Sequence, residues 1–158
     1  MKTKKEEVRL NLGCGNDHKE GFINIDKNST CNPDIICDLG SERLPFDDDS
    51  VSLVYGYQLL EHLYDHELVF LFNELKRVCS DGCKMHFVSP YMFSPVMGLI
   101  EHRKMLSEQT FRMMGDWLDV SYDIKFGVMW YRLKKFFPLP YLLPTSIQFD
   151  LIVKKIKE

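Results

Sequence analysis

A helical pattern between two short apolar runs is the feature that most constrains how this chain can fold. Over residues 65–80, apolar side chains recur at three- and four-residue spacing, and charged side chains occupy the opposite face. The run at residues 50–56 is short and β-branched, which is typical of a buried parallel strand, and residues 83–89 form a second strand candidate that stops before Pro90. We expect Asp65 to cap the helix and Gly82 to follow its last turn. Strand, helix and strand in this order predict a parallel α/β sheet.

The remaining apolar runs extend this pattern over a single domain. Before the helix, three further candidate strands occupy residues 8–12, 22–26 and 34–39. After residue 90 the pattern loosens to a short helix at 107–117 and strands at 120–127 and 147–155. A length of 158 residues suits one domain, here 1–158. We divide it into a binding core (8–90), a variable acceptor or cap segment (91–146) and a terminal strand (147–155).

Composition and charge exclude several classes of protein. Residues 1–90 carry 10 Lys and Arg against 16 Asp and Glu, whereas residues 91–158 carry 10 against 7. An acidic first half disfavours nucleic acid as a partner, because nucleic-acid binding needs a broad basic surface. No apolar run approaches the length of a membrane span, and no apolar stretch follows the N-terminal lysines as in a secretory signal. With five cysteines in no framework spacing, we expect reduced thiols and a cytoplasmic location.

Two glycines follow the first strand directly, in the segment Leu12-Gly13-Cys14-Gly15. Glycines at this place allow a tight turn and a close approach of the backbone to a ligand. A plain tight turn explains the pattern equally well. No Gly-Lys-Ser/Thr follows, which excludes a P-loop, and His18 stands where a dinucleotide fingerprint needs its third glycine. Asp26 also comes too early for that fingerprint, so nicotinamide cofactors are disfavoured.

Five elements in order resemble the class I S-adenosylmethionine-dependent methyltransferases, and most closely a small group of predicted methyltransferases similar to methyltransferase type 11. They are Leu-Gly-Cys-Gly at 12–15, Asp26, Asp38-Leu39, the segment 44–55 and Leu60-Glu-His-Leu63. The resemblance covers about residues 8–90. It implies a Rossmann-like fold with a mostly parallel seven-stranded sheet and an antiparallel last strand. Only nine residues, 13–21, separate the first two strands, so the usual first helix is reduced to one turn or missing.

The resemblance implies S-adenosylmethionine as the cofactor and assigns its binding residues. The turn of Leu12, Gly13, Cys14 and Gly15 would pass beneath the methionine part. Asp26, with Lys27 beside it, would bind the ribose hydroxyls, and a carboxylate suits that role because it accepts two hydrogen bonds. Asp38 would contact the adenine amino group, and Leu39 would lie against the ring. Tyr57 and Gln58 would face the sulfonium and the acceptor. Capping or turn formation is the structural alternative for both aspartates.

Two histidines are the candidate catalytic residues. His62 is the first choice for a general base, because its ordinary pKa lies near neutrality, and His102 is the second. His102 and Arg103 could line an acceptor site or be solvated. His62 and His66 have a possible metal-ligand spacing, but packing and pocket lining explain them better, so we expect no metal site. Cys79 and Cys83 lack a second pair and are interpreted as buried thiols.

The expected activity is methyl transfer to a small-molecule or lipid- or sugar-linked acceptor. Residues 129–144 combine aromatic and basic side chains, as membrane-interface segments do. Capping of the sheet is the favoured role for this segment; a flap that touches a bilayer is the minority hypothesis, weakened by three prolines. Two rival functions stay open: a non-catalytic module or partner subunit that binds S-adenosylmethionine, and a different nucleotide-binding enzyme. The acceptor and the oligomeric state are not readable from the sequence.

Overall fold

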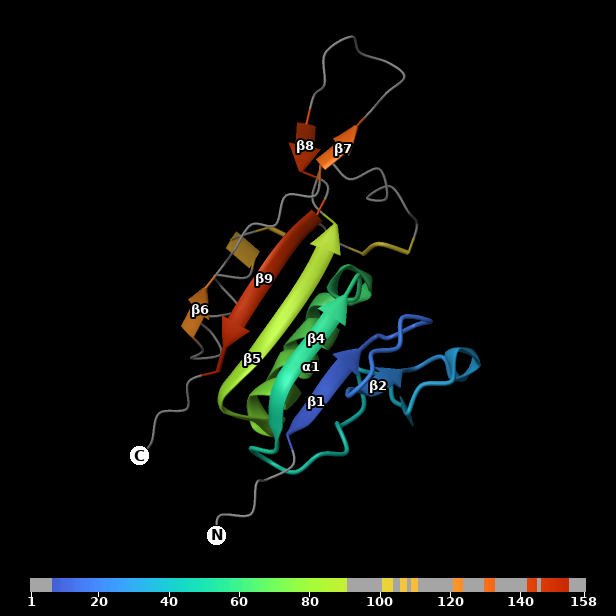
Figure 1. Cartoon of the computed structure of the whole chain (residues 1–158), viewed down its shortest axis with the longest axis vertical. Helices are drawn as coiled ribbons and strands as arrows, with labels where there is room; N and C mark the ends of the chain where they lie inside the picture. Colours follow the sequence, from blue (N-terminus) through green and yellow to red (C-terminus); the bar gives the residue numbers. More distant parts are fainter. Residues whose placement is uncertain are drawn as a thin grey trace.

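The structure is a computed structural model that describes residues 7–90, 101–103, 106–107, 109–110, 121–123, 130–132, 142–144 and 146–153. A seven-stranded sheet forms its centre, in the order β3-β2-β1-β4-β5-β9-β6 (Figure 1). The strands are β1 (Val8–Leu12), β2 (Ile23–Asp26), β3 (Ile35–Ile36), β4 (Val51–Tyr57), β5 (Cys79–Pro90), β6 (Ser121–Asp123) and β9 (Ser146–Ile152). The first five pair in parallel, and β9 lies antiparallel between β5 and β6. This confirms the predicted mostly parallel sheet with an antiparallel last strand.

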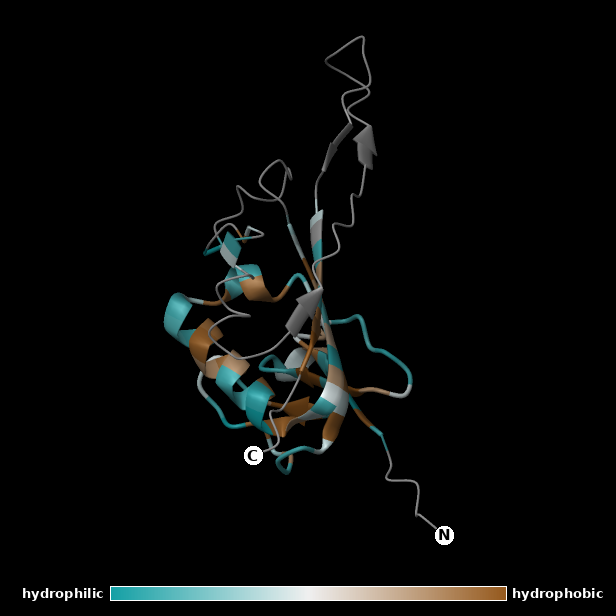
Figure 2. Ribbon diagram, turned by 90° about the vertical axis from the view of Figure 1, so that its left-hand side faces the viewer, coloured by the Kyte–Doolittle hydropathy of each residue, from teal (hydrophilic) through white to brown (hydrophobic). Residues whose placement is uncertain are grey.

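The helix α1 (Asp65–Val78) connects β4 to β5 and packs on one face of the sheet (Figure 2). Its buried residues are Leu68, Leu71, Phe72, Leu75 and Val78. Phe72 meets Phe87 of β5 with ring centroids 5.6 Å apart. These side chains join the inward residues of the central strands in a single core cluster. The predicted helical periodicity is therefore the packing face of α1.

Both predicted ends of this helix are shifted in the structure. The N-cap is Tyr64 rather than Asp65, and the Glu67 carboxylate accepts the Tyr64 N–H at 2.7 Å. At the other end β5 begins at once with Cys79, so Gly82 lies inside a strand and not after a helix. Gly82 has φ +81° where the β4–β5 register slips, which is the geometry of a β-bulge. A sequence pattern cannot distinguish this bulge from a helix stop, because both use a glycine at positive φ.

The connection from β1 to β2 contains turns and no helix, as its short length predicts. A buried amide pair holds it against the sheet instead. The Asn11 amide donates to Asp17 O at 2.8 Å and to Asn24 Oδ1 at 2.9 Å, and Asn24 Oδ1 also accepts the Lys19 N–H. Asp34 accepts the Asn24 backbone N–H at 2.7 Å, and the Asn24 hydrogen bonds lower the pKa of Asp34. Polar contacts thus replace the apolar packing that a helix would supply here.

On the sheet face opposite α1, side chains from four strands form a polar row in register: Asn11, Tyr55, His86 and Asp150. The Tyr55 and His86 rings stack with centroids 5.3 Å apart, and His86 Nδ1 lies 2.6 Å from Asp150 Oδ1. The Lys19 ammonium sits 4.1 Å from the centre of the Tyr55 ring. No α-helix of the described residues covers this face (Figure 2).

The remaining described segments bear on other sequence predictions. A 3₁₀ turn η1 (Ser29–Cys31) follows β2, and η2 (Leu60–His62) follows β4. Two short strands, β7 (Trp130–Arg132) and β8 (Leu142–Pro144), pair antiparallel. The rest of the segment 129–144, most of the expected helix 107–117 and the ends of the expected strand 120–127 lie outside the described residues. None of the five cysteines forms a disulfide, and Cys79 and Cys83 are buried. None of the helices in the described ranges has the length and apolarity needed to cross a membrane.

Candidate functional site

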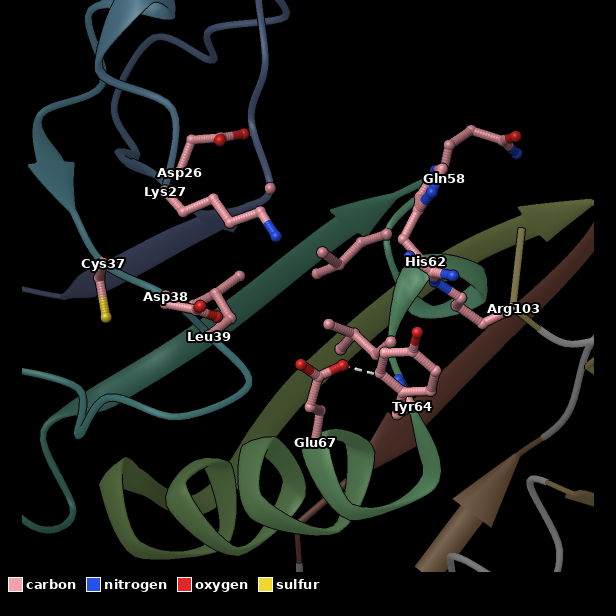
Figure 3. A pocket seen from close by; sticks show the side chains of 13 residues that line it. Asp26, Lys27, Cys37, Asp38, Leu39, Gln58, His62, Tyr64, Glu67 and Arg103 are labelled. Carbon is pink, nitrogen blue, oxygen red and sulfur yellow. Dashed lines mark hydrogen bonds between the residues drawn. The ribbon is translucent and has the colours of Figure 1, made fainter. Parts of the chain in front are cut away.

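A pocket of about 320 Å³ opens at the carboxyl ends of the parallel strands (Figure 3). The pocket is lined by the turn after β1, by the ends of β2 and β3, and by the segment that runs from the end of β4 into α1. Arg103 adds one residue from the later part of the chain. The lining residues are Gly13, Asp26, Lys27, Cys37, Asp38, Leu39, Gln58, Leu59, His62, Leu63, Tyr64, Glu67 and Arg103. Ligands bind at this edge of open α/β sheets because the loops that follow the strands converge there.

The glycine turn forms the floor of the pocket at the end of β1. Gly13 has φ +60° and Gly15 has φ +48°, in the left-handed region that favours glycine. A Cβ at Gly13 would lie 2.7 Å from Leu59 Cδ1, whereas a Cβ at Gly15 would meet open space. The Gly15 N–H donates to Asp26 Oδ2 at 2.9 Å, and the Cys14 N–H donates to Ile25 O at 3.0 Å. The turn is therefore tied to the end of β2 by two hydrogen bonds.

Two carboxylates lie on the same side of the pocket, at the ends of neighbouring strands. Figure 3 shows Asp26 at the end of β2 and Lys27 after it, with Asp38 and Leu39 after β3. Asp26 Oδ1 accepts the Asn28 N–H at 2.9 Å, so both of its oxygens are oriented by backbone groups. Asp38 Oδ1 accepts the Gly40 N–H at 3.0 Å. Each carboxylate oxygen has a second lone pair for a ligand donor.

The opposite side of the pocket is built by the residues that follow β4. Gln58 has φ +52° and turns the chain into η2, which carries His62. The Arg103 guanidinium lies 4.7 Å from the centre of the Tyr64 ring, and the Arg103 N–H donates to Glu61 O at 2.7 Å. His62 Nδ1 lies 3.2 Å from Glu101 O. These contacts bring residues 101–103 against η2.

The structure places the sequence candidates in four ways. Most of them line the pocket: Gly13, Asp26, Lys27, Asp38, Leu39, Gln58 and His62. Three support it, because Leu12 and Cys14 are buried behind the turn and Gly15 is hydrogen-bonded to Asp26. His102 lies beside His62, with ring centroids 4.9 Å apart. Tyr57 is 43% exposed and is not among the lining residues. Side chains alternate along β4, so Tyr57 belongs to the sheet face of Tyr55.

Several lining residues were not identified from the sequence. Leu59 and Leu63 are four residues apart around η2, a spacing that can mark them as neighbours. Cys37, Tyr64 and Glu67 carry no local signal for a pocket position. Burial, followed by the charge of Asp26, raises the pKa of Cys14 to about 11, so its thiol stays neutral beside the turn.

No protein-family model matches this sequence, and no curated protein matches it significantly. Solved structures do match. A SAM-dependent methyltransferase from Archaeoglobus fulgidus superposes with a TM-score of 0.74 at 16% identity, over 94% of this chain and 87% of that chain. Phosphoethanolamine N-methyltransferase 2 from Haemonchus contortus, in complex with S-adenosyl-L-methionine, gives a TM-score of 0.69 at 13% identity, over 97% of this chain and 50% of that one.

A third similar structure is a complex of the Haloferax volcanii Trm112 methyltransferase activator with a methyltransferase. It gives a TM-score of 0.65 at 14% identity, over 98% of this chain and 86% of that chain. Similarity at these identities establishes architecture, and the mostly parallel sheet with its antiparallel last strand agrees with it. This chain therefore has the fold of the class I S-adenosylmethionine-dependent methyltransferases.

Proposed function

We propose that this protein binds S-adenosylmethionine in the pocket at the carboxyl ends of β1, β2 and β3 and transfers its methyl group to a small acceptor. One observation carries the proposal. The glycine turn, Asp26 and Asp38 with Leu39 come from three successive strand ends, and they border one pocket in a class I methyltransferase fold. Neighbours of that fold include a methyltransferase in complex with S-adenosyl-L-methionine.

Within this proposal the cofactor lies along the row of strand ends. Asp26 accepts the ribose hydroxyls through the lone pairs left free by Gly15 and Asn28. Asp38 receives the adenine amino group, and buried Leu39 packs against the ring. The methionine part then crosses Gly13 toward Gln58. This order puts the sulfonium near the side of the pocket that carries His62.

The sulfonium is already activated, so the protein has to align donor and acceptor, exclude water and manage one proton. His62 is the proposed residue for that proton, and His102 is the second candidate. The Glu101 carbonyl can only accept, so His62 Nδ1 carries the hydrogen and Nε2 keeps its lone pair. On the side of the pocket that carries His62, the Arg103 guanidinium favours an acceptor with an anionic group such as a lipid- or sugar-linked phosphate. A peripheral membrane contact through residues 129–144 stays a proposal.

Binding of the cofactor is tested first, by isothermal titration of the full chain with S-adenosylmethionine, S-adenosylhomocysteine and NAD. We expect micromolar affinity for the first two, about −8 kcal/mol, and none for NAD. Tight NAD binding would assign the pocket to another nucleotide enzyme. Turnover is tested by incubating the protein with methyl-labelled S-adenosylmethionine and metabolite or lipid extracts and measuring the release of S-adenosylhomocysteine. The labelled product then identifies the acceptor.

A second candidate function is a cofactor-binding subunit without turnover of its own. The polar row of Tyr55, His86 and Asp150 favours it, because these side chains are partly exposed on the sheet face opposite α1. A neighbouring methyltransferase structure was solved with a protein activator. Cofactor binding without S-adenosylhomocysteine release, restored when a copurifying protein is added, would support this role over that of an independent enzyme.

A further inference from the structure

Three potential metal ligands converge behind the acceptor side of the pocket: Glu61, His62 and His102. One ligand atom from each lies within 4.8 Å of the others. The two imidazole rings meet edge to face, with centroids 4.9 Å apart. His62 also lines the pocket. The cluster therefore combines residues forty positions apart in the sequence at one wall of the proposed site.

Glu61 is the unusual member of this cluster. Its side chain is 1% exposed, and neither carboxylate oxygen has a hydrogen-bond partner. The Ser89 hydroxyl is the neighbouring polar group; it is fully buried and interacts with this carboxylate, but the two groups do not reach hydrogen-bond distance. A buried carboxylate without a hydrogen-bond partner is costly. A bound cation would supply the missing partner.

The histidines present compatible nitrogens. His62 Nδ1 donates to Glu101 O, which orients the ring and leaves Nε2 available, as second-shell carbonyls do for metal-bound histidines. His102 Nδ1 is buried without a partner. The Arg103 N–H bond to Glu61 O fixes the two segments relative to each other.

We propose that Glu61, His62 and His102 bind one divalent transition-metal ion at the acceptor side of the pocket. Two imidazoles and one carboxylate suit Zn²⁺, Mn²⁺, Co²⁺ or Fe²⁺ better than Mg²⁺ or Ca²⁺. Metal–ligand distances of about 2.0–2.2 Å place ligand atoms about 3.0–3.5 Å apart, so small side-chain rotations must close the cluster. Three protein ligands leave coordination positions open for water or an acceptor oxygen.

The chemical role of this ion rests on the proposed methyl transfer, to which it would add activation of the acceptor. Bound to an acceptor hydroxyl, it would lower the pKa of that hydroxyl and let its proton pass to water. The oxygen then forms a bond to the methyl carbon as the carbon–sulfur bond breaks, which releases S-adenosylhomocysteine. His62 would hold the ion through Nε2 instead of removing the proton itself.

The test measures metal binding without cofactor or acceptor, so it is independent of the proposed methyl transfer. The full chain is freed of metal with EDTA, dialysed, and titrated with Co²⁺ and Zn²⁺ by absorption spectroscopy and calorimetry. We expect one saturable site per chain with a Co²⁺ spectrum of nitrogen and oxygen ligands, and thermal stabilisation on loading. A sulfur-to-cobalt charge-transfer band at that site would place the ion on the cysteines and overturn the proposal.

Variants separate this site from other ligands. Glu61→Gln keeps the side-chain shape, and we expect it and His102→Ala to weaken Co²⁺ binding at least about tenfold. Without metal, Glu61→Gln should melt no lower than the wild type, because the carboxylate it replaces is buried without a partner. His66→Ala is the matched control, since His66 is exposed and stacks only on Tyr64 among the described rings. Wild-type metal affinity in Glu61→Gln, or equal loss in His66→Ala, overturns the proposal.

Discussion

The Gly15 backbone N–H donates a hydrogen bond of 2.9 Å to Asp26 Oδ2, which joins the turn after β1 to the end of β2. A second backbone donor, the Asn28 N–H, holds the other carboxylate oxygen. Asp26 is thus oriented at the pocket wall before any ligand arrives. A preoriented acceptor loses less side-chain entropy on binding, so this carboxylate is the residue through which the cofactor proposal is best tested.

Replacement of Asp26 by Ala should weaken S-adenosylmethionine binding by about 1.5–3 kcal/mol, the scale for hydrogen bonds to a charged group. Asp26→Asn, which keeps one carbonyl oxygen, should lose less. Calorimetric titration measures both, and Asp47→Ala controls for loss of an exposed carboxylate outside the pocket. Wild-type affinity in Asp26→Ala would contradict the ribose assignment.

The sequence predicted the mostly parallel sheet and the reduced or missing first helix, because these follow from the succession of strand and helix patterns and from connection length. It did not predict the amide pair of Asn11 and Asn24, since two asparagines in strands carry no pattern that shows they are buried together. It also placed Tyr57 in the pocket, although alternation along β4 turns that ring to the other face.

The cluster of Glu61, His62 and His102 shows the same limit more sharply. From the sequence, Glu61 and His62 were expected near the pocket. His62 and His66 were the only two histidines whose spacing suggested a metal site. His102 meets His62 through tertiary packing of residues 101–103 on η2. A contact across forty residues has no local signature, so it required the structure.

Gly13→Ala should destabilise the protein more than Gly15→Ala. Both positions have positive φ, which costs a non-glycine residue about 1–2 kcal/mol. Only at Gly13 does the new Cβ also approach Leu59, at 2.7 Å, and that side chain must move within the pocket wall. Urea unfolding gives the two stabilities, and we expect cofactor affinity to fall further in Gly13→Ala. Equal losses at the two glycines would show that the Leu59 contact has no energetic weight.

His62→Ala should lower turnover by about 10²- to 10⁴-fold while S-adenosylmethionine binding stays nearly unchanged. The residue lies on the acceptor side of the pocket, away from the two carboxylates assigned to the cofactor. Steady-state rates and calorimetric affinities are measured on the same preparation, with His66→Ala as the control. A lower melting temperature with normal specific activity would instead make His62 a packing residue.

Acid should destabilise the protein through Glu74. Its carboxylate accepts hydrogen bonds from Arg77 and from the Leu44 N–H, and the Arg77 side chain lowers the pKa of Glu74 in the folded state. Because the pKa of Glu74 is lower in the folded state than its ordinary value of 4.5, the ionised carboxylate stabilises the fold at pH values above 4.5. This contribution is lost as the pH falls from 4.5 through the lower pKa of the folded state. Urea midpoints measured across this range should decline less steeply in Glu74→Gln. An identical decline in the variant would assign the acid sensitivity to other carboxyls.

Cys14 should resist alkylation at neutral pH although it belongs to the glycine turn. Its side chain is 5% exposed, and burial raises its pKa to about 11, so the reactive thiolate is scarce. Cys31 is only half-buried and should react with iodoacetamide first. Peptide mass spectrometry over a time course gives both rates.

Labelling of Cys14 requires the turn to open, which breaks the hydrogen bond from the Cys14 N–H to Ile25 O. Bound S-adenosylhomocysteine should oppose this opening and therefore slow the labelling of Cys14 further. The rate at Cys31 is the internal control, and faster labelling of Cys14 than of Cys31 would show that the turn opens readily in solution.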